Sequence, residues 1–262
     1  MLDCCTPLRY FSKLAFDGLG SSVSILKCYP EWFINGGTGI TIGLCDGSVD
    51  ESILDLNKAN LTVQHFADAG SGSIISNRHG TFSATLLVGQ GHHLIRGIAP
   101  QARLLVADVL GSQGSTEPEA IARALDWLIS EPVQLIAIPL GVPVEYPSII
   151  RLIEKATARG IQILGAAGNW YPAPVSFPAC HPKVVAVGAA DYMGQILPNC
   201  SRWPKLDLLA PGKNVAALVG GDRLRSFSGS SAACIVATGV VALQLSAQGS
   251  ISVKKKTCSA MQ

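Results

Sequence analysis

Charged residues are scarce in this sequence, and the two signs nearly cancel. They make up 15% of the 262 residues, and the formal net charge at pH 7 is +2. A protein that binds nucleic acid through its phosphates usually carries a strongly basic surface, so this composition gives no reason to expect such a partner. Hydrophobic residues make up 48% of the chain, which predicts a globular protein with a sizeable core.

Long apolar segments are also lacking. The longest apolar run, from Ala232 to Leu245, is too short to span a bilayer and is rich in small residues that suit close packing. The residues from Met1 to Lys13 contain neither a continuous apolar region nor a small-residue cleavage pattern. We therefore expect no membrane span, no secretory signal and a cytoplasmic location.

The eight cysteines have no metal-binding spacing, because the sequence contains no CxxC motif and no Cys/His cluster. Without an export signal, these cysteines are predicted to stay reduced. The sequence therefore predicts no zinc site, and it gives no indication of a cofactor.

Short apolar runs that alternate with helical patterns fill most of the chain. The predicted strands cover residues 40–45, 61–65, 102–109, 133–138, 161–167, 183–188 and 206–210. Helices are predicted over 117–131, 148–159 and 232–245, with another that begins at or near His79. This alternation predicts an α/β fold with a mostly parallel central sheet and helices on both faces. We expect one domain over residues 39–262, after an irregular N-terminal extension over residues 1–38.

Three residues at the edges of these predicted elements could act together. Asp46 follows the strand 40–45, at the end of a parallel strand where open α/β sheets form their sites. His79 lies near the start of a buried helix, and Ser231 lies at the start of another, where backbone N–H groups favour a developing oxyanion. Each also has an ordinary explanation, since Asp46 could be a turn residue and Ser231 a helix cap.

The short motifs around these residues are Asp46-Gly-Ser, His79-Gly-Thr and Gly229-Ser-Ser231-Ala-Ala. In this chain order they resemble the Asp-Ser/Thr-Gly, His-Gly-Thr and Gly-Thr-Ser-Met-Ala motifs of subtilisin-like serine proteases. Further matches run in register with the family: Gly97-Ile-Ala-Pro, Val109-Leu-Gly, Leu140-Gly, Ala166-Ala-Gly-Asn169 and Ala210-Pro-Gly. The resemblance extends from about Ile40 to Leu245.

The resemblance implies a three-layer subtilisin-like fold and a serine endopeptidase. A serine hydroxyl is a weak nucleophile until an imidazole removes its proton, so His79 would act as general base and then as general acid. Asp46 would hold the imidazole tautomer, and Ser231 would attack the peptide carbonyl. Asn169 matches the oxyanion-hole asparagine of the family, whose side chain would act with the Ser231 backbone N–H.

The resemblance also implies a peptide or protein substrate that binds as an extended strand between two backbone segments. Main-chain pairing supplies affinity, while pockets select side chains, so the substrate sequence is not predicted. Two of the matching positions lie beside the pocket for the residue before the scissile bond, namely Ala167 and Gly168. The positions expected to pair with the substrate are Gly114, Ser115, Thr116, Leu140 and Gly141.

The sequence departs from the family pattern near the predicted site. The usual Ser-Leu-Gly reads Pro139-Leu-Gly, and Cys234-Ile-Val stands where Ser-Pro-His commonly follows the nucleophile. Cys45 and Cys234 lie close in sequence to presumed triad members. They are interpreted either as small buried hydrophobic residues or as targets of thiol reagents that would inhibit the enzyme. Few residues follow Ser231, so the closing strands of the family are expected to be shortened or replaced.

The family's calcium loop is expected between His79 and Gly97, where this chain reads Gly-Gln-Gly-His-His. This sequence lacks the hard carboxylate ligands that calcium prefers, and calcium binding through carbonyl oxygens stays open as an alternative. We therefore predict no metal site.

Three functions fit the sequence. The first is a serine endopeptidase in peptide or protein processing. The stretch before the first predicted strand is expected to be too short for an inhibitory prosegment, which fits intracellular processing better than a secreted, self-activating degradative enzyme. The compact motifs also look similar to the leader-cleaving subtilases of cyanobactin-type maturation. The second is a catalytically silent, peptide-binding protein with the subtilase fold. The third is a peptide ligase that uses the same triad.

Overall fold

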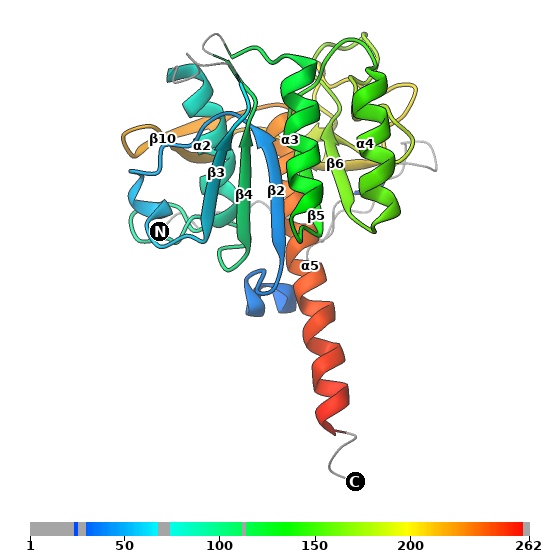
Figure 1. The fold of residues 1–262 in the computed structure, drawn as a ribbon. Helices are drawn as coiled ribbons and strands as arrows, with labels where there is room; N and C mark the ends of the chain where they lie inside the picture. The colour runs from blue at the N-terminus through cyan, green and yellow to red at the C-terminus, as the bar shows by residue number, and fades with distance from the viewer. Residues whose placement is uncertain (1–23, 26–29, 68–73, 112–113, 259–262) are drawn as a thin grey trace.

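The computed structural model of the chain describes residues 24–25, 30–67, 74–111 and 114–258 (Figure 1). Within them lies an eight-stranded sheet in the order β1-β8-β7-β6-β5-β2-β4-β3, and every neighbouring pair is parallel. This confirms the predicted parallel sheet. The strands are β1 (Ser24–Ile25), β2 (Thr41–Asp46), β3 (Leu61–His65), β4 (Arg103–Asp108), β5 (Leu135–Ile138), β6 (Gln162–Ala166), β7 (Val185–Ala190) and β8 (Leu208–Pro211).

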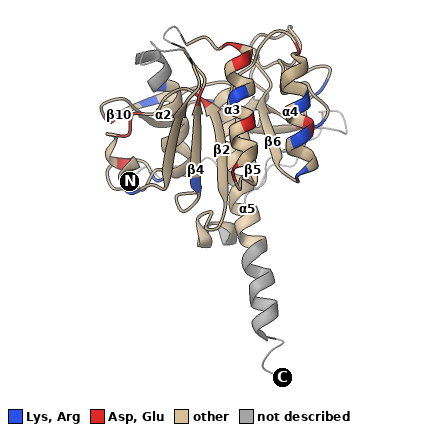
Figure 2. Cartoon of the chain, viewed as in Figure 1, with Lys and Arg blue, Asp and Glu red and all other residues tan. Residues whose placement is uncertain are grey.

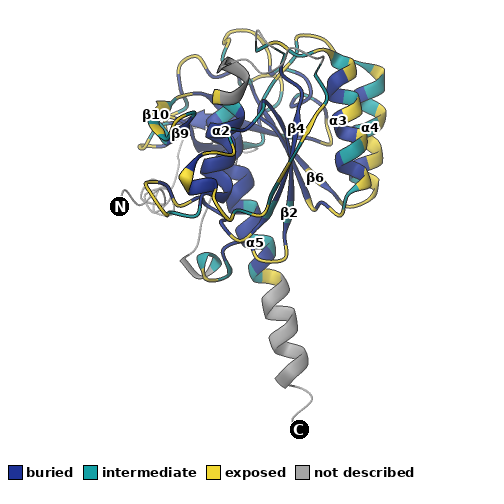
Figure 3. Ribbon diagram, turned by 60° about the vertical axis from the view of Figure 1, so that its left-hand side comes forward, coloured by how far each residue is buried: buried dark blue, intermediate teal, exposed yellow. Residues whose placement is uncertain are grey.

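Helices cover both faces of the sheet, as predicted (Figure 3). Helices α2 (Ile74–Val88) and α5 (Ser230–Cys258) pack on one face, and α3 (Pro118–Ser130) and α4 (Pro147–Ala158) pack on the other. Successive residues of a strand point to opposite faces, so Leu44 joins the α2–α5 core and Cys45 joins the α3–α4 core. Burial on both faces explains why the central strands are continuous apolar runs.

The outer helices α3 and α4 are amphipathic, and their ends follow from local sequence. Pro118 and Pro147 begin the two helices, where a residue without an N–H costs no hydrogen bond. Gly160, with φ +79°, follows α4 in the left-handed conformation that ends many helices. Figure 2 shows residues of both charges on α3 and α4, as expected for solvated faces.

Helix α2 begins at Ile74, earlier than the sequence indicated, so His79 lies in its second turn. The helix packs against the turn that follows β2. A Cβ atom on Gly80 would lie 2.1 Å from the carbonyl oxygen of Gly47 and 2.3 Å from that of Ser48. Only glycine allows this approach, which brings the helix close to the end of β2.

Helix α5 is 29 residues long, well beyond the predicted 232–245. In the described part of the chain it is the one helix long and apolar enough, over Ser230–Gln248, to cross a membrane. This window extends beyond the run Ala232–Leu245 from which the sequence expectation was drawn. However, 72% of that window is buried inside the fold, where it packs against β5 to β8. This burial explains its apolar composition as that of a core helix.

Several described elements were not predicted. The hairpin of β9 (Val215–Val219) and β10 (Arg223–Phe227) packs on α2, where the rings of Phe82 and Phe227 lie 4.3 Å apart between centroids. Two short 3-10 helices, η1 (Pro30–Asn35) and η2 (Leu54–Leu56), also occur. The predicted irregular stretch 1–38 contains β1 and η1, while 1–23 and 26–29 lie outside the described residues. The domain boundary at residue 39 stays a prediction.

Candidate active site

The predicted site residues gather along the carboxyl edge of the sheet. Strand β2 ends at Asp46, and it lies between β5 and β4. The segment after β5 contains Pro139, and the segment after β6 contains Asn169. Because all these strands are parallel, the segments that leave them emerge at the same edge. The register of the sheet therefore assembles the site from segments far apart in the sequence.

Asp46 and His79 form a direct pair. The distance from His79 Nδ1 to Asp46 Oδ1 is 2.5 Å. The Asp46 carboxylate is fully buried, and it also accepts hydrogen bonds from the Gly47 N–H at 2.6 Å and the Ser83 hydroxyl at 2.6 Å. These donors fix the carboxylate. Because Nδ1 is bound to the acid, the free ring nitrogen of His79 is Nε2.

The charge of Asp46 raises the pKa of His79 above its ordinary value. Burial of the imidazole lowers the pKa, and the hydrogen bond that the His79 ring donates to the Asp46 carboxylate adds to the increase. An imidazole in this setting becomes a stronger base, as general base catalysis requires.

Two adjacent serines begin α5, and their surroundings differ. Ser230 is 1% exposed, and its hydroxyl accepts a hydrogen bond from the Gly168 N–H at 3.0 Å. Ser231 is half-buried and follows it in the first turn. The first N–H groups of a helix lack partners within the helix, so the Ser231 N–H is a potential oxyanion donor. The Ser230 hydroxyl thus has a structural role within the protein, whereas the Ser231 side chain is the more accessible of the two.

The Ser231 hydroxyl does not donate to the His79 imidazole in this structure. Its single proton goes to the carbonyl oxygen of Pro139, with 2.7 Å between the oxygens. The expected bridge from carboxylate to imidazole to hydroxyl is therefore present only in its first half. Pro139 stands where the family usually has serine, and its carbonyl remains available as an acceptor although its N–H is lost.

Asn169 is oriented by the start of α5. Its Oδ1 accepts a hydrogen bond from the Ser230 N–H at 2.8 Å. Only the carbonyl end of an amide can accept, so this bond assigns the two ends of the side chain and leaves Nδ2 as a donor. A Cβ atom on Gly229 would lie 2.9 Å from that nitrogen, so glycine is needed there to admit the amide.

The predicted substrate segments lie on two sides of Asp46, because β4 and β5 are the neighbours of β2. Gly141 and Ser115 are exposed, while Leu140, Gly114 and Thr116 are half-buried. Ala167 is fully buried, and its N–H and carbonyl bond to Val187 and Ser176. Gly168 also uses both backbone groups within the protein, with Ser230 and Ser201. Ala167 and Gly168 thus support Asn169 and offer no backbone group for strand pairing.

A second His–Asp pair, which the sequence interpretation missed, lies at the ends of the next two strands, β4 and β3. His65 Nδ1 lies 2.7 Å from Oδ2 of the buried Asp108, and the His65 side chain is 60% exposed. Asp108 is the register partner of both Asp46 and His65. The signal available in the sequence was position, since His65 ends the predicted strand 61–65 and Asp108 lies one residue before the end of the predicted strand 102–109.

The buried cysteines are poor targets for thiol reagents. Cys45 and Cys234 are fully buried free thiols, and burial raises the pKa of both, that of Cys234 to about 12. We expect iodoacetamide to leave both unmodified in the folded protein, as mapped by mass spectrometry, and to modify both in urea. Inactivation that follows alkylation of Cys234 in the folded protein would contradict this.

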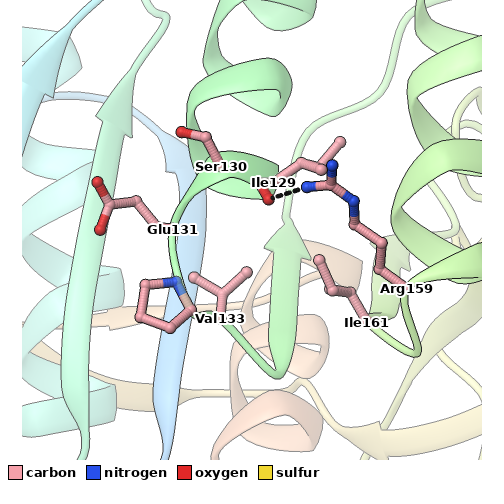
Figure 4. A pocket seen from close by; sticks show the side chains of 7 residues that line it. Ile129, Ser130, Glu131, Val133, Arg159 and Ile161 are labelled. Carbon is pink, nitrogen blue, oxygen red and sulfur yellow. Dashed lines mark hydrogen bonds between the residues drawn. The ribbon is translucent and has the colours of Figure 1, made fainter.

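A shallow pocket lies at the opposite edge of the sheet, where β5 and β6 begin (Figure 4). Arg159 there donates from Nη1 to the carbonyl oxygen of Ile129 at 2.8 Å. None of the predicted site residues lines this pocket, whose lining consists of Ile129, Ser130, Glu131, Pro132, Val133, Arg159 and Ile161.

A parallel α/β sheet with an Asp–His pair and a helix-start serine at its carboxyl edge is typical of serine hydrolases. The sequence matches the Subtilase family over residues 37–260, and the chain therefore belongs to that family. Its relatives include the intracellular serine protease of Paenibacillus polymyxa, 29% identical over 84% of this chain and 71% of that protein. Another is the major intracellular serine protease of Bacillus subtilis (strain 168), 29% identical over 86% of this chain and 74% of that protein. The chain is a subtilisin-like serine endopeptidase.

Solved structures agree with this assignment. The prenylagaramide maturation protease PagA has a TM-score of 0.72 and 25% identity, over 86% of this chain and 78% of that one. The patellamide maturation protease PatA has a TM-score of 0.74 and 25% identity, over 82% and 81%. The predicted similarity to cyanobactin-type subtilases is thereby confirmed.

Proposed function

We propose that Asp46, His79 and Ser231 are the catalytic triad of this endopeptidase, with Asn169 as the oxyanion donor. The observation that carries the proposal is the bond of 2.5 Å between His79 Nδ1 and the buried Asp46 carboxylate. It fixes the tautomer, stabilises the imidazolium that forms during the reaction and leaves Nε2 to take a proton.

The reaction would begin with a rotation of the Ser231 side chain. The hydroxyl now donates to the Pro139 carbonyl, and its proton would have to turn from that oxygen to His79 Nε2. As the proton moves to Nε2, the Ser231 oxygen attacks the substrate carbonyl carbon and a tetrahedral intermediate forms. Its collapse breaks the C–N bond, and the leaving amine takes the proton from His79. Water then repeats the sequence to release the acid and restore Ser231.

The oxyanion of that intermediate would lie between Asn169 Nδ2 and the Ser231 N–H. Both donors are set in advance, because the Ser230 N–H holds Asn169 Oδ1 and the start of α5 holds the Ser231 N–H. Donors that need no rearrangement are the most effective way to stabilise developing charge.

Replacing Asn169 by alanine is expected to lower kcat by roughly 10²–10³-fold, the loss found when the equivalent donor is removed from subtilisin. KM should change little, because the donor acts on charge that develops after binding. Steady-state hydrolysis of a peptide p-nitroanilide measures both constants. A loss that appears mainly in KM would assign Asn169 to substrate binding instead.

The substrate would be a peptide or protein that lies as an extended strand between Gly114–Thr116 and Leu140–Gly141. These segments follow β4 and β5, on either side of the strand that ends at Asp46. We infer processing as the role, since PagA and PatA are named maturation proteases. We place it in the cytoplasm, since the two bacterial relatives are named intracellular.

Labelling with a fluorophosphonate tests the proposal. The folded protein should form one adduct that maps to Ser231, and Ser231→Ala and His79→Ala should each abolish it. Folded protein that remains unlabelled would instead indicate a silent, peptide-binding protein. A peptide ester with and without an added amine then separates hydrolysis from acyl transfer, because a ligase would give the amide in preference to the acid.

A further inference from the structure

The loop that follows α2, residues 89–97, lies where the resemblance to the family places calcium. Calcium takes six to eight oxygen ligands turned toward one point. In this chain the loop has a different set of contacts, which involve the carboxylate of Asp55 and the side-chain amide of Gln90.

Asp55 lies in η2 and is fully buried. Its Oδ1 accepts from the His93 N–H at 2.5 Å, and its Oδ2 accepts from the Leu94 and Ile95 N–H groups at 2.7 and 2.6 Å. Successive N–H groups that converge on one acceptor make an anion-binding nest. A cation at this carboxylate would meet the positive ends of three N–H groups, so the loop is built around an anion.

Carbonyl oxygens at the two ends of the loop bond to N–H groups of the loop itself. Gly97 donates to the Gly89 carbonyl at 2.8 Å, and Gly91 donates to the Ile95 carbonyl at 3.1 Å. Each of these carbonyls has two lone pairs and has used one of them within the loop. Calcium bound through carbonyls, which the sequence left open, would therefore compete with the bonds that close the loop.

The side chain of Gln90 brings further donors to two more carbonyls. Its Nε2 donates to the Val88 carbonyl at 2.6 Å and to the Pro100 carbonyl at 2.8 Å. One NH2 group thus lies between two carbonyl oxygens from opposite sides of the loop, in the kind of position that a cation would take. The backbone N–H of Gln90 donates to the backbone carbonyl of Asp55 at 2.6 Å.

We propose that this loop binds no calcium and that Asp55 and Gln90 hold it closed in place of a metal. The Asp55 carboxylate accepts hydrogen bonds from the converging N–H groups, and the Gln90 amide links the Val88 and Pro100 carbonyls. Directly after the loop, the N–H groups of Ile98 and Ala99 bond to the Leu86 and Leu87 carbonyls at the end of α2. The helix that carries His79 is therefore secured without a metal ion.

Thermal unfolding in the Ser231→Ala background, which avoids self-digestion, tests the first half of the proposal. The Tm should stay the same within about 1 °C in EGTA and in millimolar calcium, since a ligand that binds the folded state raises Tm by mass action. A rise in Tm with calcium, or a bound ion detected by calorimetric titration, overturns the proposal.

Asp55→Asn tests the role of the carboxylate. Asparagine turns an NH2 group toward the N–H groups that Oδ2 accepted, so we expect Tm to fall by about 5–10 °C, given the usual worth of hydrogen bonds to a charged group. Asp191→Asn is the matched control. Oδ1 of Asp191 accepts both the Met193 and Gln195 N–H groups at 2.9 Å, and asparagine retains that oxygen. Equal Tm values for the two variants would overturn the role of Asp55.

Gln90→Glu tests whether the side-chain amide of Gln90 occupies the position between two carbonyl oxygens that a cation would otherwise take. The new carboxylate would face the Val88 and Pro100 carbonyls, so Tm should fall in EGTA and recover when calcium is added. A variant with the Tm of the parent in both conditions would overturn the role of Gln90.

Discussion

Ser231→Ala is expected to lower kcat for peptide hydrolysis by roughly 10⁶-fold, the loss found when the nucleophile of subtilisin is removed. Alanine removes the oxygen that attacks, while the Asp46–His79 pair and the oxyanion donors remain. Helix α5 should be unaffected, because alanine favours helices and the hydroxyl makes one bond, to the Pro139 carbonyl. Initial rates with a peptide p-nitroanilide, at substrate concentrations above KM, measure the loss.

Ser230→Ala is the matched control, because it makes the same change one residue earlier. The Gly168 N–H would lose its acceptor there, which costs about 1–3 kcal/mol of stability. Catalysis should suffer far less than in Ser231→Ala, and fluorophosphonate labelling should persist. Similar losses of kcat in the two variants, or more than about 1% residual activity in Ser231→Ala, would show that the wrong serine has been assigned.

The sheet and its helices were predictable because their signals are local. Strands such as β2 and β4 are buried on both faces and therefore appear as continuous apolar runs, and α3 and α4 have amphipathic patterns that begin near proline. The hairpin of β9 and β10 gave no such signal. Its second strand is largely exposed, and its position depends on contacts with α2, such as that of Phe227 with Phe82.

The candidate site residues could be identified from sequence motifs, but the hydrogen bonds that they make could not be predicted. The bond that the Ser230 N–H donates to Asn169 spans 61 residues, and the bond that the Ser231 hydroxyl donates to the Pro139 carbonyl spans 92. Such bonds depend on the register of the sheet and on side-chain rotamers, which sequence patterns do not specify. For the same reason, the sequence did not predict the hydrogen bond between His65 and Asp108 or the contacts of Asp55 with the loop after α2. A buried acid with partners far away in the chain resembles any other turn or helix residue in the sequence.

Asp46→Asn is expected to lower kcat by about 10⁴-fold, because the amide neither holds the imidazole tautomer nor stabilises the imidazolium. The pH dependence should change as well. The charge of Asp46 is the largest cause that raises the pKa of His79, and His79 must be neutral to accept a proton. In the parent enzyme, activity is therefore lost on acidification at a higher pH than for an ordinary histidine. In the variant, the acid limb of kcat/KM should move to lower pH.

Asp108→Asn is the control that separates this effect from a general loss of buried charge. Asp108 is equally buried and is the register partner of Asp46 on the next strand, but its imidazole partner is His65. We expect its variant to keep kcat within about tenfold and to keep the acid limb in place, with Tm measured to account for any loss of folding. A shift of the acid limb in both variants would mean that His79 responds to the summed charge of the sheet edge. A shift in Asp46→Asn alone would mean that catalysis depends on the direct bond between Asp46 and Nδ1.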